Sequence, residues 1–427
     1  MGSGRGVAAI APGEAYRRWW RGSAATCGRG SAVNNGAVIY GATMLPLGIR
    51  SRFVDNNNGI AMHVLEAGFE GAGRPCVVLL HGFPELAYSW RKVMLPLAEA
   101  GFHVVAPDQR GYGRSGGTDV AFDDDLRPFS LLNRVRDTLG LVFALGHRSV
   151  AAVIGHDYGS PVAAWCALVR PDVFRSAVLM SAPFEGSPSL PFNTANRATT
   201  DDAPAGPSIH DELAALHPSR KHYQRYYATR AANGDLWHCP QGVHDFLRAY
   251  YHVKSGDWEG NDPFPLQAWS AAELAKLPRY YVMERDKDMA LTVVPEMPSA
   301  AAIAACGWLP DEELRVYSAE YAKTGFQGGL QSYRAGTGGT DAEELRLFSG
   351  RMLDVPTCFI AGASDWGVYQ RPGALERMQG EACTQMRGVH LVEGAGHWVQ
   401  QERPEEVSEL LIAFVRVQVS SLIPERF

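Results

Sequence analysis

Short continuous apolar runs recur along the chain and alternate with segments of helical periodicity. A run of four to six apolar residues that ends at a turn is typical of a strand buried on both faces of a sheet. One late segment instead repeats apolar residues at i, i+3, i+4, i+7 and i+8, at 407, 410, 411, 414 and 415, which predicts a helix beginning near Pro404. The runs that predict strands are residues 76–81, 102–107, 150–154, 177–180, 357–361 and 389–392.

Strands that alternate with helices predict a mostly parallel sheet with helices on both faces, so the fold class is α/β. The alternation stops near Phe184 and resumes near Val355. The stretch between is too long for a loop and contains helical patterns at 271–277 and 311–321, with no comparable apolar strand run. We therefore predict a sheet core from residues 44–184 and 355–427, with residues 185–354 inserted as a helical cap over the carboxyl ends of the strands.

Residues 1–43 differ in composition from the rest of the chain. They are rich in Gly, Ala, Ser and Arg and contain Glu14 as their only acidic residue. We predict a poorly ordered extension, and the alternative is a mitochondrial transit peptide, which has this Arg-rich, acid-poor character. Otherwise the predicted compartment is the cytoplasm.

Overall composition excludes several classes of protein. Forty Lys and Arg against 46 Asp and Glu give a net charge of −6, which argues against a nucleic-acid partner. No run of 18 apolar residues is present, so no membrane span is expected. Seven widely spaced cysteines without a CxxC pair suggest neither disulfides nor a metal site. The Gly111-Tyr-Gly113 turn lacks the further residues of a phosphate loop, so no cofactor is predicted. The oligomeric state is left open, a homodimer included.

The third apolar run leads into Gly155-His-Asp157-Tyr-Gly159 and then a helical segment. This is the G-x-nucleophile-x-G form of a nucleophile elbow, with Asp where esterases have Ser. Glycines on either side allow the strand to turn sharply into the helix. The alternative is that Asp157 only caps that helix. The strand before it and the helix after it favour a catalytic nucleophile.

Two further residues occupy the positions that such a nucleophile requires. Asp365 follows the run at 357–361, and His397 lies in a glycine-rich loop after the run at 389–392. The order nucleophile, acid, histidine is that of hydrolases built on this type of sheet. Asp365 could instead be an ordinary turn aspartate. In His81-Gly-Phe83-Pro-Glu85, the Phe83 amide and the amide of Tyr158 can converge as an oxyanion hole.

Four motifs together resemble one family, the epoxide hydrolases of the α/β-hydrolase fold. They are HGFPE at 81–85, DQRGYGRS at 108–115, GHDYG at 155–159 and GAGHW at 394–398, and the resemblance covers most of residues 50–420. Two segments in the predicted cap, at 221–224 and 324–334, are similar to those that carry the paired tyrosines of this family, here Tyr223 and Tyr333. The first of these matches is short, and Tyr226 or Tyr227 could replace Tyr223.

The resemblance implies a reaction. Asp157 would open a small apolar epoxide and form an alkyl ester, and His397, oriented by Asp365, would activate water to hydrolyse that ester. The two tyrosines would protonate the leaving oxygen. The sequence departs from the family at Ser160, at Tyr158 and in the added N-terminal segment.

Two other functions remain open. A haloalkane or haloacid dehalogenase uses the same Asp-His-Asp set, but Phe83 stands where haloalkane dehalogenases place a halide-binding residue, and no Arg follows Asp157 as in fluoroacetate dehalogenases. A non-catalytic ligand-binding relative is the third alternative.

Overall fold

The computed structural model describes residues 39–40, 43–189 and 207–422, and the predicted extension at 1–43 lies almost entirely outside these ranges. Its last residues form part of a small antiparallel pair, in which Ile39 and Tyr40 bond to Met44 and Thr43. No helix within the described ranges is long and apolar enough to cross a bilayer.

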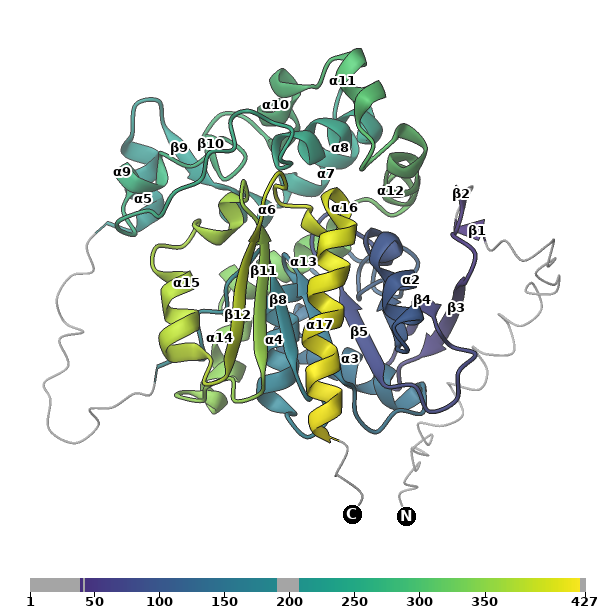
Figure 1. The fold of residues 1–427 in the computed structure, drawn as a ribbon. Helices are drawn as coiled ribbons and strands as arrows, with labels where there is room; N and C mark the ends of the chain where they lie inside the picture. Colours follow the sequence, from purple (N-terminus) through teal and green to yellow (C-terminus); the bar gives the residue numbers. More distant parts are fainter. Residues whose placement is uncertain (1–38, 41–42, 190–206, 423–427) are drawn as a thin grey trace, which may run out of the picture. The chain divides into compact units, whose positions relative to one another are not determined.

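An eight-stranded sheet forms the centre of the fold, in the order β12-β11-β8-β7-β5-β6-β4-β3 (Figure 1). The six strands from β12 to β6 run parallel, whereas β4 is antiparallel to both of its neighbours, β6 and β3. This confirms the predicted α/β class. The strands of the molecule are β1 (Ile39–Tyr40), β2 (Thr43–Met44), β3 (Ile49–Asp55), β4 (Ala61–Ala67), β5 (Cys76–Leu80), β6 (His103–Pro107), β7 (Ala152–His156), β8 (Ala177–Met180), β9 (Arg220–His222), β10 (Val282–Glu284), β11 (Thr357–Gly362) and β12 (Met386–Val392).

All six apolar runs are strands of this sheet, with small shifts at their ends. The third run begins later than predicted, because Val150 forms only an isolated bridge to Phe174 before β7 starts. The prediction that the inserted region contains no comparable strand needs a small correction, since β9 and β10 form a three-residue antiparallel pair there.

Helices cover both faces of the sheet. Side chains of α2 and α17 join one apolar cluster and those of α3 and α4 join the other, because successive strand residues point to opposite faces. The helix predicted from Pro404 is confirmed as α17. The helical elements outside the region between β8 and β11 are η1 (Ala87–Trp90), α2 (Arg91–Glu99), η2 (Arg127–Phe129), α3 (Leu131–Ala144), α4 (Gly159–Val169), η6 (Trp366–Val368), α15 (Ala374–Arg377), η7 (Met378–Ala382), α16 (Val399–Glu402) and α17 (Pro404–Leu422).

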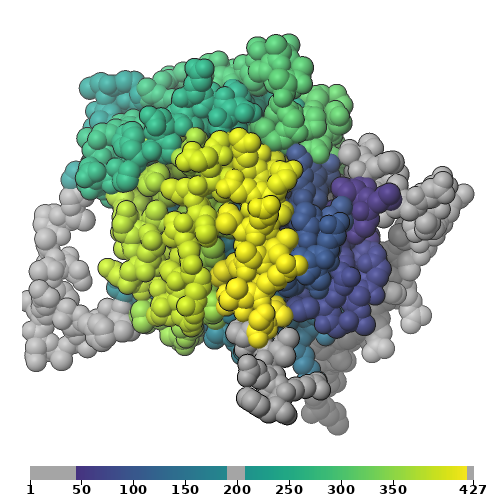
Figure 2. All heavy atoms as spheres, viewed as in Figure 1, coloured from purple at the N-terminus to yellow at the C-terminus, as the bar shows by residue number. Residues whose placement is uncertain are grey.

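The predicted insertion at residues 185–354 is described at 185–189 and 207–354, and the second of these ranges is mostly helical. In Figure 1 its helices from α5 to α12 lie beyond one end of the sheet, whereas α14 lies beside the sheet near α15, and Figure 2 shows the teal and green surface meeting that of the C-terminal segment. Of the predicted helical patterns, 271–277 is helical only as far as Leu274, and 311–321 continues to Thr324. Its helices are α5 (Ile209–Ala215), α6 (Tyr223–Tyr227), α7 (Ala231–Trp237), α8 (Gly242–Val253), α9 (Ala271–Leu274), α10 (Met289–Val293), η4 (Val294–Glu296), α11 (Ala300–Ala305), α12 (Asp311–Thr324), α13 (Gln327–Thr337), α14 (Thr340–Leu345) and η5 (Arg346–Phe348).

Candidate active site

Asp157 lies in the sharp turn between β7 and α4. Its backbone is in the left-handed region, with φ of 50°, which non-glycine residues seldom adopt. The flanking glycines have no room for a side chain. A Cβ on Gly155 would lie 1.9 Å from the carbonyl oxygen of Gly159, and one on Gly159 would lie 2.2 Å from that of Leu80. The glycines therefore permit the turn, and the turn holds the Asp157 carboxylate beyond the end of the sheet.

The carboxylate of Asp157 is held between two other loops. Its Oδ1 accepts a hydrogen bond from the Phe83 amide at 2.9 Å, and its Oδ2 lies 3.3 Å from Nε2 of His397. Helix α4 begins at Gly159 without a side-chain cap. These contacts exclude the alternative in which Asp157 merely caps that helix.

His397 is bound on its other side by Asp365. Its Nδ1 lies 3.1 Å from both carboxylate oxygens of Asp365, and both residues are buried. An ionised carboxylate only accepts, so Nδ1 carries the proton of this contact and Nε2 faces Asp157. Asp365 also accepts from the Gly367 amide at 2.7 Å, so it is a turn aspartate and a partner of His397 at once.

The charges of these three groups reinforce one another. Burial alone would raise the pKa of Asp157, but the contact with His397 and its charge lower that pKa below its usual value. Burial would likewise raise the pKa of Asp365, and the charge of His397 lowers it. For His397, burial and the charge of Lys254 lower the pKa, whereas the two aspartates outweigh them and raise it to about 8. At neutral pH the site therefore holds two carboxylates and an imidazolium.

Tyr223 and Tyr333 come from α6 and α13 and meet with ring centroids 6.2 Å apart. Burial and then the charge of Asp157 raise the pKa of both phenols, so each stays protonated. The Tyr223 hydroxyl donates to Oε1 of Gln370 at 3.2 Å. The structure thus brings both predicted tyrosines to the side of the site that carries Asp157.

Tyr226 and Tyr227, the alternatives to Tyr223, have different contacts. The hydroxyl of Tyr226 donates to Oδ2 of Asp235 at 3.0 Å, and its pKa is raised by burial and by that aspartate. Tyr227 packs its ring 5.1 Å from both Phe83 and Tyr333. Tyr226 is therefore engaged elsewhere, while Tyr227 lies beside the predicted pair.

The two residues predicted to form an oxyanion hole are adjacent to Asp157 in different ways. The Phe83 amide already bonds to the carboxylate, as described above. Tyr158 follows Asp157 directly in the chain. Within the described part of the structure, the Phe83 amide donates a hydrogen bond to the Asp157 carboxylate and the Tyr158 amide does not. Their rings pack 5.6 Å and 5.8 Å from that of Tyr333, so both also form part of the apolar wall around the site.

A buried polar network beneath the site was not predicted. Glu85 accepts from the Gly82 amide at 3.0 Å, and its Oε2 lies 2.6 Å from Nδ1 of His156. Nε2 of His156 in turn lies 2.6 Å from the carbonyl oxygen of His397. These hydrogen bonds connect the HGFPE turn, the turn of Asp157 and the loop of His397. The position of Glu85 within a matched motif was the only sequence signal for it.

Glu402 holds the loop of His397 from the other side. Its carboxylate accepts from the amides of Gly396 at 3.0 Å, Trp398 at 2.9 Å and Gly256 at 2.7 Å. Burial raises the pKa of Glu402 to about 7 in spite of these donors. The sequence offers no pattern that distinguishes this glutamate from its neighbours.

One group among the described residues has the chemistry of metal ligands. Sγ of Cys76 and ring nitrogens of His103 and His147 lie within 4.8 Å of one another. Cys76 and His103 begin β5 and β6, so this group is at the opposite end of the sheet from Asp157. The two imidazoles bond to each other at 2.8 Å. The group therefore lies outside the candidate site.

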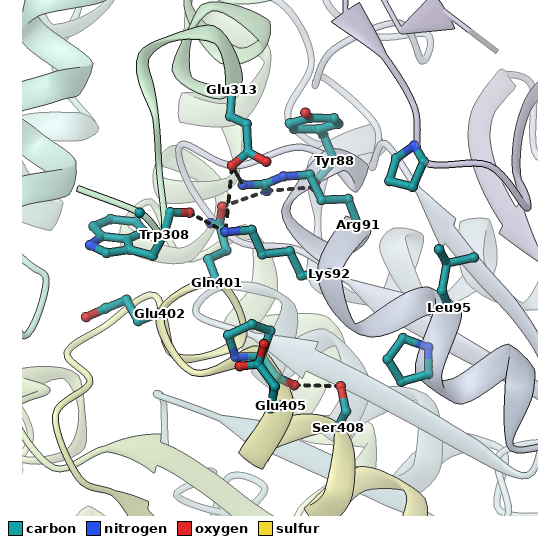
Figure 3. Close-up of a pocket in the computed structure, with 14 residues that line it drawn as sticks. Tyr88, Arg91, Lys92, Leu95, Trp308, Glu313, Gln401, Glu402, Glu405 and Ser408 are labelled. Carbon is teal, nitrogen blue, oxygen red and sulfur yellow. Dashed lines mark hydrogen bonds and ion pairs between the residues drawn. The ribbon is translucent and has the colours of Figure 1, made fainter. Parts of the chain in front are cut away.

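A surface pocket of about 620 Å³ lies between α2, α17 and the start of α12 (Figure 3). Its two cations have partners within the protein. Arg91 bonds to Glu313, and Lys92 donates to the carbonyl oxygen of Trp308 at 2.7 Å. None of the predicted site residues lines it. The pocket is therefore separate from the Asp157 site.

Comparison with known proteins gives consistent results. The model of the alpha/beta hydrolase fold family matches residues 75–404. Epoxide hydrolase B of Mycobacterium tuberculosis is 32% identical over 380 residues, which cover 84% of this chain and 96% of that protein. Epoxide hydrolase A of the same organism is 32% identical over 367 residues, covering 85% and 96%.

Solved structures agree with these matches. The epoxide hydrolase from an endophytic Streptomyces superposes with a TM-score of 0.70 at 29% identity, over 88% of this chain and 97% of that one. Epoxide hydrolase A from Mycobacterium thermoresistibile has a TM-score of 0.64 at 31% identity, over 86% and 98%.

Proposed function

Because the chain belongs to the epoxide hydrolases of the α/β-hydrolase fold family, we propose that it converts a small apolar epoxide and water to a vicinal diol through an ester on Asp157. The observation that carries this proposal is an anionic Asp157 faced by two buried phenols whose pKa values its charge raises. Such phenols remain protonated and can donate to an oxygen that develops negative charge next to the carboxylate.

In the first step an oxygen of Asp157 attacks one carbon of the epoxide. A carbon–oxygen bond forms to the carboxylate as the ring carbon–oxygen bond breaks, and the ring oxygen becomes an alkoxide. Tyr223 and Tyr333 stabilise this oxygen by hydrogen bonds, and a phenol proton neutralises it. The phenolate that remains regains its proton from solvent, so the product is a hydroxyalkyl ester of Asp157 beside a neutral phenol, and the charge of the carboxylate is gone.

In the second step His397 takes a proton from water through Nε2, and the resulting hydroxide attacks the carbonyl carbon of the ester. Asp365 holds the imidazole by Nδ1 and stabilises the imidazolium that forms. The Phe83 amide, with that of Tyr158, stabilises the oxyanion of the tetrahedral intermediate. Its collapse releases the diol, whose alkoxide takes the proton from His397, and leaves Asp157 as a carboxylic acid with an oxygen from water. That acid passes its proton to Nε2 of His397, which restores the pair of carboxylate and imidazolium.

The phenols separate this reaction from dehalogenation, which would use the same Asp157, His397 and Asp365. A halide leaves without a proton and gains little from an acid. The oxygen of an opened epoxide, in contrast, must receive a proton from an acid. Tyr158, which follows the nucleophile, also supplies no cation for the carboxylate of a haloacid.

The test is turnover of styrene oxide and of 1-bromobutane by the purified chain, with phenylethanediol and bromide measured separately. We expect diol and no bromide, and an Asp157→Asn variant that unfolds cooperatively and forms neither product. Bromide release that depends on Asp157 would establish a dehalogenase. Saturable binding of the epoxide without any product would indicate a ligand-binding relative.

A further inference from the structure

Lys254, directly after α8, is a buried lysine inside the site region. Its residue is only 3% exposed. Four aromatic rings surround its ammonium, with centroids 5.1 Å (Tyr281), 5.4 Å (Tyr250), 5.6 Å (Trp398) and 5.8 Å (Tyr280) from Nζ. Ring faces attract a cation, but they are weak substitutes for a carboxylate.

No residue in the described ranges accepts a hydrogen bond from this ammonium or forms an ion pair with it. The nearby carboxylates are engaged elsewhere, Asp157 and Asp365 with His397 and Glu85 with His156. A buried charge without a direct partner is costly, so stability does not explain a lysine here. A charge kept in such surroundings is a candidate for a functional role.

The backbone fixes Lys254 relative to His397. The His397 amide donates to the carbonyl oxygen of Lys254 at 2.7 Å. A Cβ on Gly396 would lie 2.4 Å from the carbonyl carbon of Ser255 and 2.5 Å from the carbonyl oxygen of Lys254, so the two loops are in direct contact. The backbone of Lys254 is therefore held directly beside that of His397.

We propose that Lys254 is a positioning residue that keeps the His397 imidazole unprotonated, and so able to activate water, once Asp157 has become an ester. This inference rests on the proposed function. It names a residue that acts through His397 and does not itself touch the reacting atoms.

The argument follows from the charges that face His397. In the free enzyme Asp157 lies on its Nε2 side and Asp365 on its Nδ1 side, with Lys254 as the opposing cation and the His156 ring 5.0 Å away. Ester formation removes the charge of Asp157. Of the two aspartates that raise the pKa of His397, only Asp365 then keeps its charge, while Lys254 still faces the imidazole and lowers that pKa. Burial lowers the pKa of Lys254 itself, and the charges of Asp365 and Glu85 continue to raise it after Asp157 is neutral. The imidazole is thus a cation before the attack and a base after it.

The first test is the rate of ester hydrolysis against pH, measured after rapid formation of the ester on excess enzyme. We expect Lys254→Met to move the acid limb of this profile to higher pH by about one unit, so that hydrolysis is about tenfold slower on the limb. The plateau at high pH should be unchanged. Lys254→Arg keeps the charge and should follow the wild type.

Lys221→Met is the matched control. Its ammonium also lies over a tyrosine ring, 4.8 Å from the centroid of Tyr226. The acidic groups that act on it are Asp235, Asp288 and Asp286, none of which belongs to the site. This variant should leave the profile unchanged. A Lys254→Met variant whose profile keeps its wild-type limb, or that loses rate equally at every pH, would overturn the proposal.

A second measurement does not depend on catalysis. Asp157→Asn makes residue 157 neutral, as the ester does, so NMR titration of His397 in this background reports the same charge balance. Adding Lys254→Met should raise the pKa of His397, and Lys254→Gln provides a second neutral variant should the first not fold. An unchanged pKa would refute the role of Lys254. If the pKa of His397 rises in this background but the wild-type chain never forms an ester with an epoxide, the proposed function alone is refuted.

Discussion

At the scale of single residues, the proposed reaction depends on Tyr223 and Tyr333, which would determine the chemistry that Asp157 performs. Each phenol is buried beside the Asp157 charge, and together they would share the alkoxide that forms as the ring opens. Loss of a single donor to an oxyanion typically costs a factor of about 10²–10³ in rate. The second phenol should moderate that loss.

We therefore predict that Tyr223→Phe and Tyr333→Phe each slow ester formation by roughly 10- to 100-fold, which corresponds to about 1.4–2.8 kcal/mol. The double variant should lose far more. Stopped-flow measurement of the alkylation step tests this. Tyr226→Phe is the control, because its hydroxyl already binds Asp235. An effect at Tyr333 but not at Tyr223 would transfer the second role to Tyr227, and a double variant of unchanged rate would contradict phenol assistance.

Residues whose role is set by a local motif could be predicted from the sequence, and residues placed by long-range packing could not. Asp157 stands in a turn that requires its two flanking glycines, and His397 and Asp365 follow strands that end at the same edge of the sheet. Lys254 and Glu402 reach the site only because two distant loops meet. No sequence pattern near either residue predicts that these loops are in contact.

At the scale of elements, the histidine loop and the loop after α8 are packed backbone to backbone. Gly396 is the contact, and a methyl group there would collide with the backbone of Ser255 and Lys254. Relief of the collision must shift one loop, and the shift would carry His397 away from Asp157. A misplacement of about 1 Å at a reacting group can cost about 10² in rate.

We predict that Gly396→Ala destabilises the protein by about 1–3 kcal/mol and lowers kcat at least about tenfold. Gly234→Ala in α7 is the control, since a Cβ there meets nothing within 4 Å. That change should leave kcat intact and stabilise the helix slightly. Urea unfolding and steady-state kinetics measure both effects. Wild-type kcat in Gly396→Ala would show that the loop contact does not position His397.

Elements buried on both faces were the ones that apolar runs predicted, apart from β12, whose run at 389–392 lies in a strand that is only partly buried. β3 and β4 have no such run, because β3 lies at the sheet edge and β4 buries His63 and Glu66. The polar side chains of β4 are satisfied by partners that only the fold provides, such as Arg52, whose Nε is 2.5 Å from Glu66. The sequence motifs nonetheless led to the family that the comparisons confirm.

At the scale of the whole molecule, the ion pair of Asp157 and His397 links stability to pH. Folding raises the pKa of His397 from 6.5 to about 8, so the folded state binds the proton more tightly. The resulting stabilisation is fully present below the unfolded pKa of 6.5 and is lost as pH rises through about 8. For a fully buried group this shift corresponds to about 2 kcal/mol.

We predict that the free energy of unfolding falls by about 2 kcal/mol more between pH 6 and pH 9 in the wild type than in Asp157→Asn, in the limit that the variant restores the ordinary pKa. Urea denaturation at several pH values measures the difference. Parallel pH dependences for the two proteins would mean that Asp157 does not hold the proton on His397.

The central claim is that catalysis passes through an ester on Asp157, and a His397→Gln variant tests it most directly. Attack needs the carboxylate and the phenols, whereas hydrolysis needs the imidazole, so this variant should form the ester and fail to release it. Intact-protein mass spectrometry after mixing with styrene oxide should show one added substrate mass, and peptide mapping should place it on Asp157. Full turnover without any adduct, or an adduct on another residue, would contradict the account.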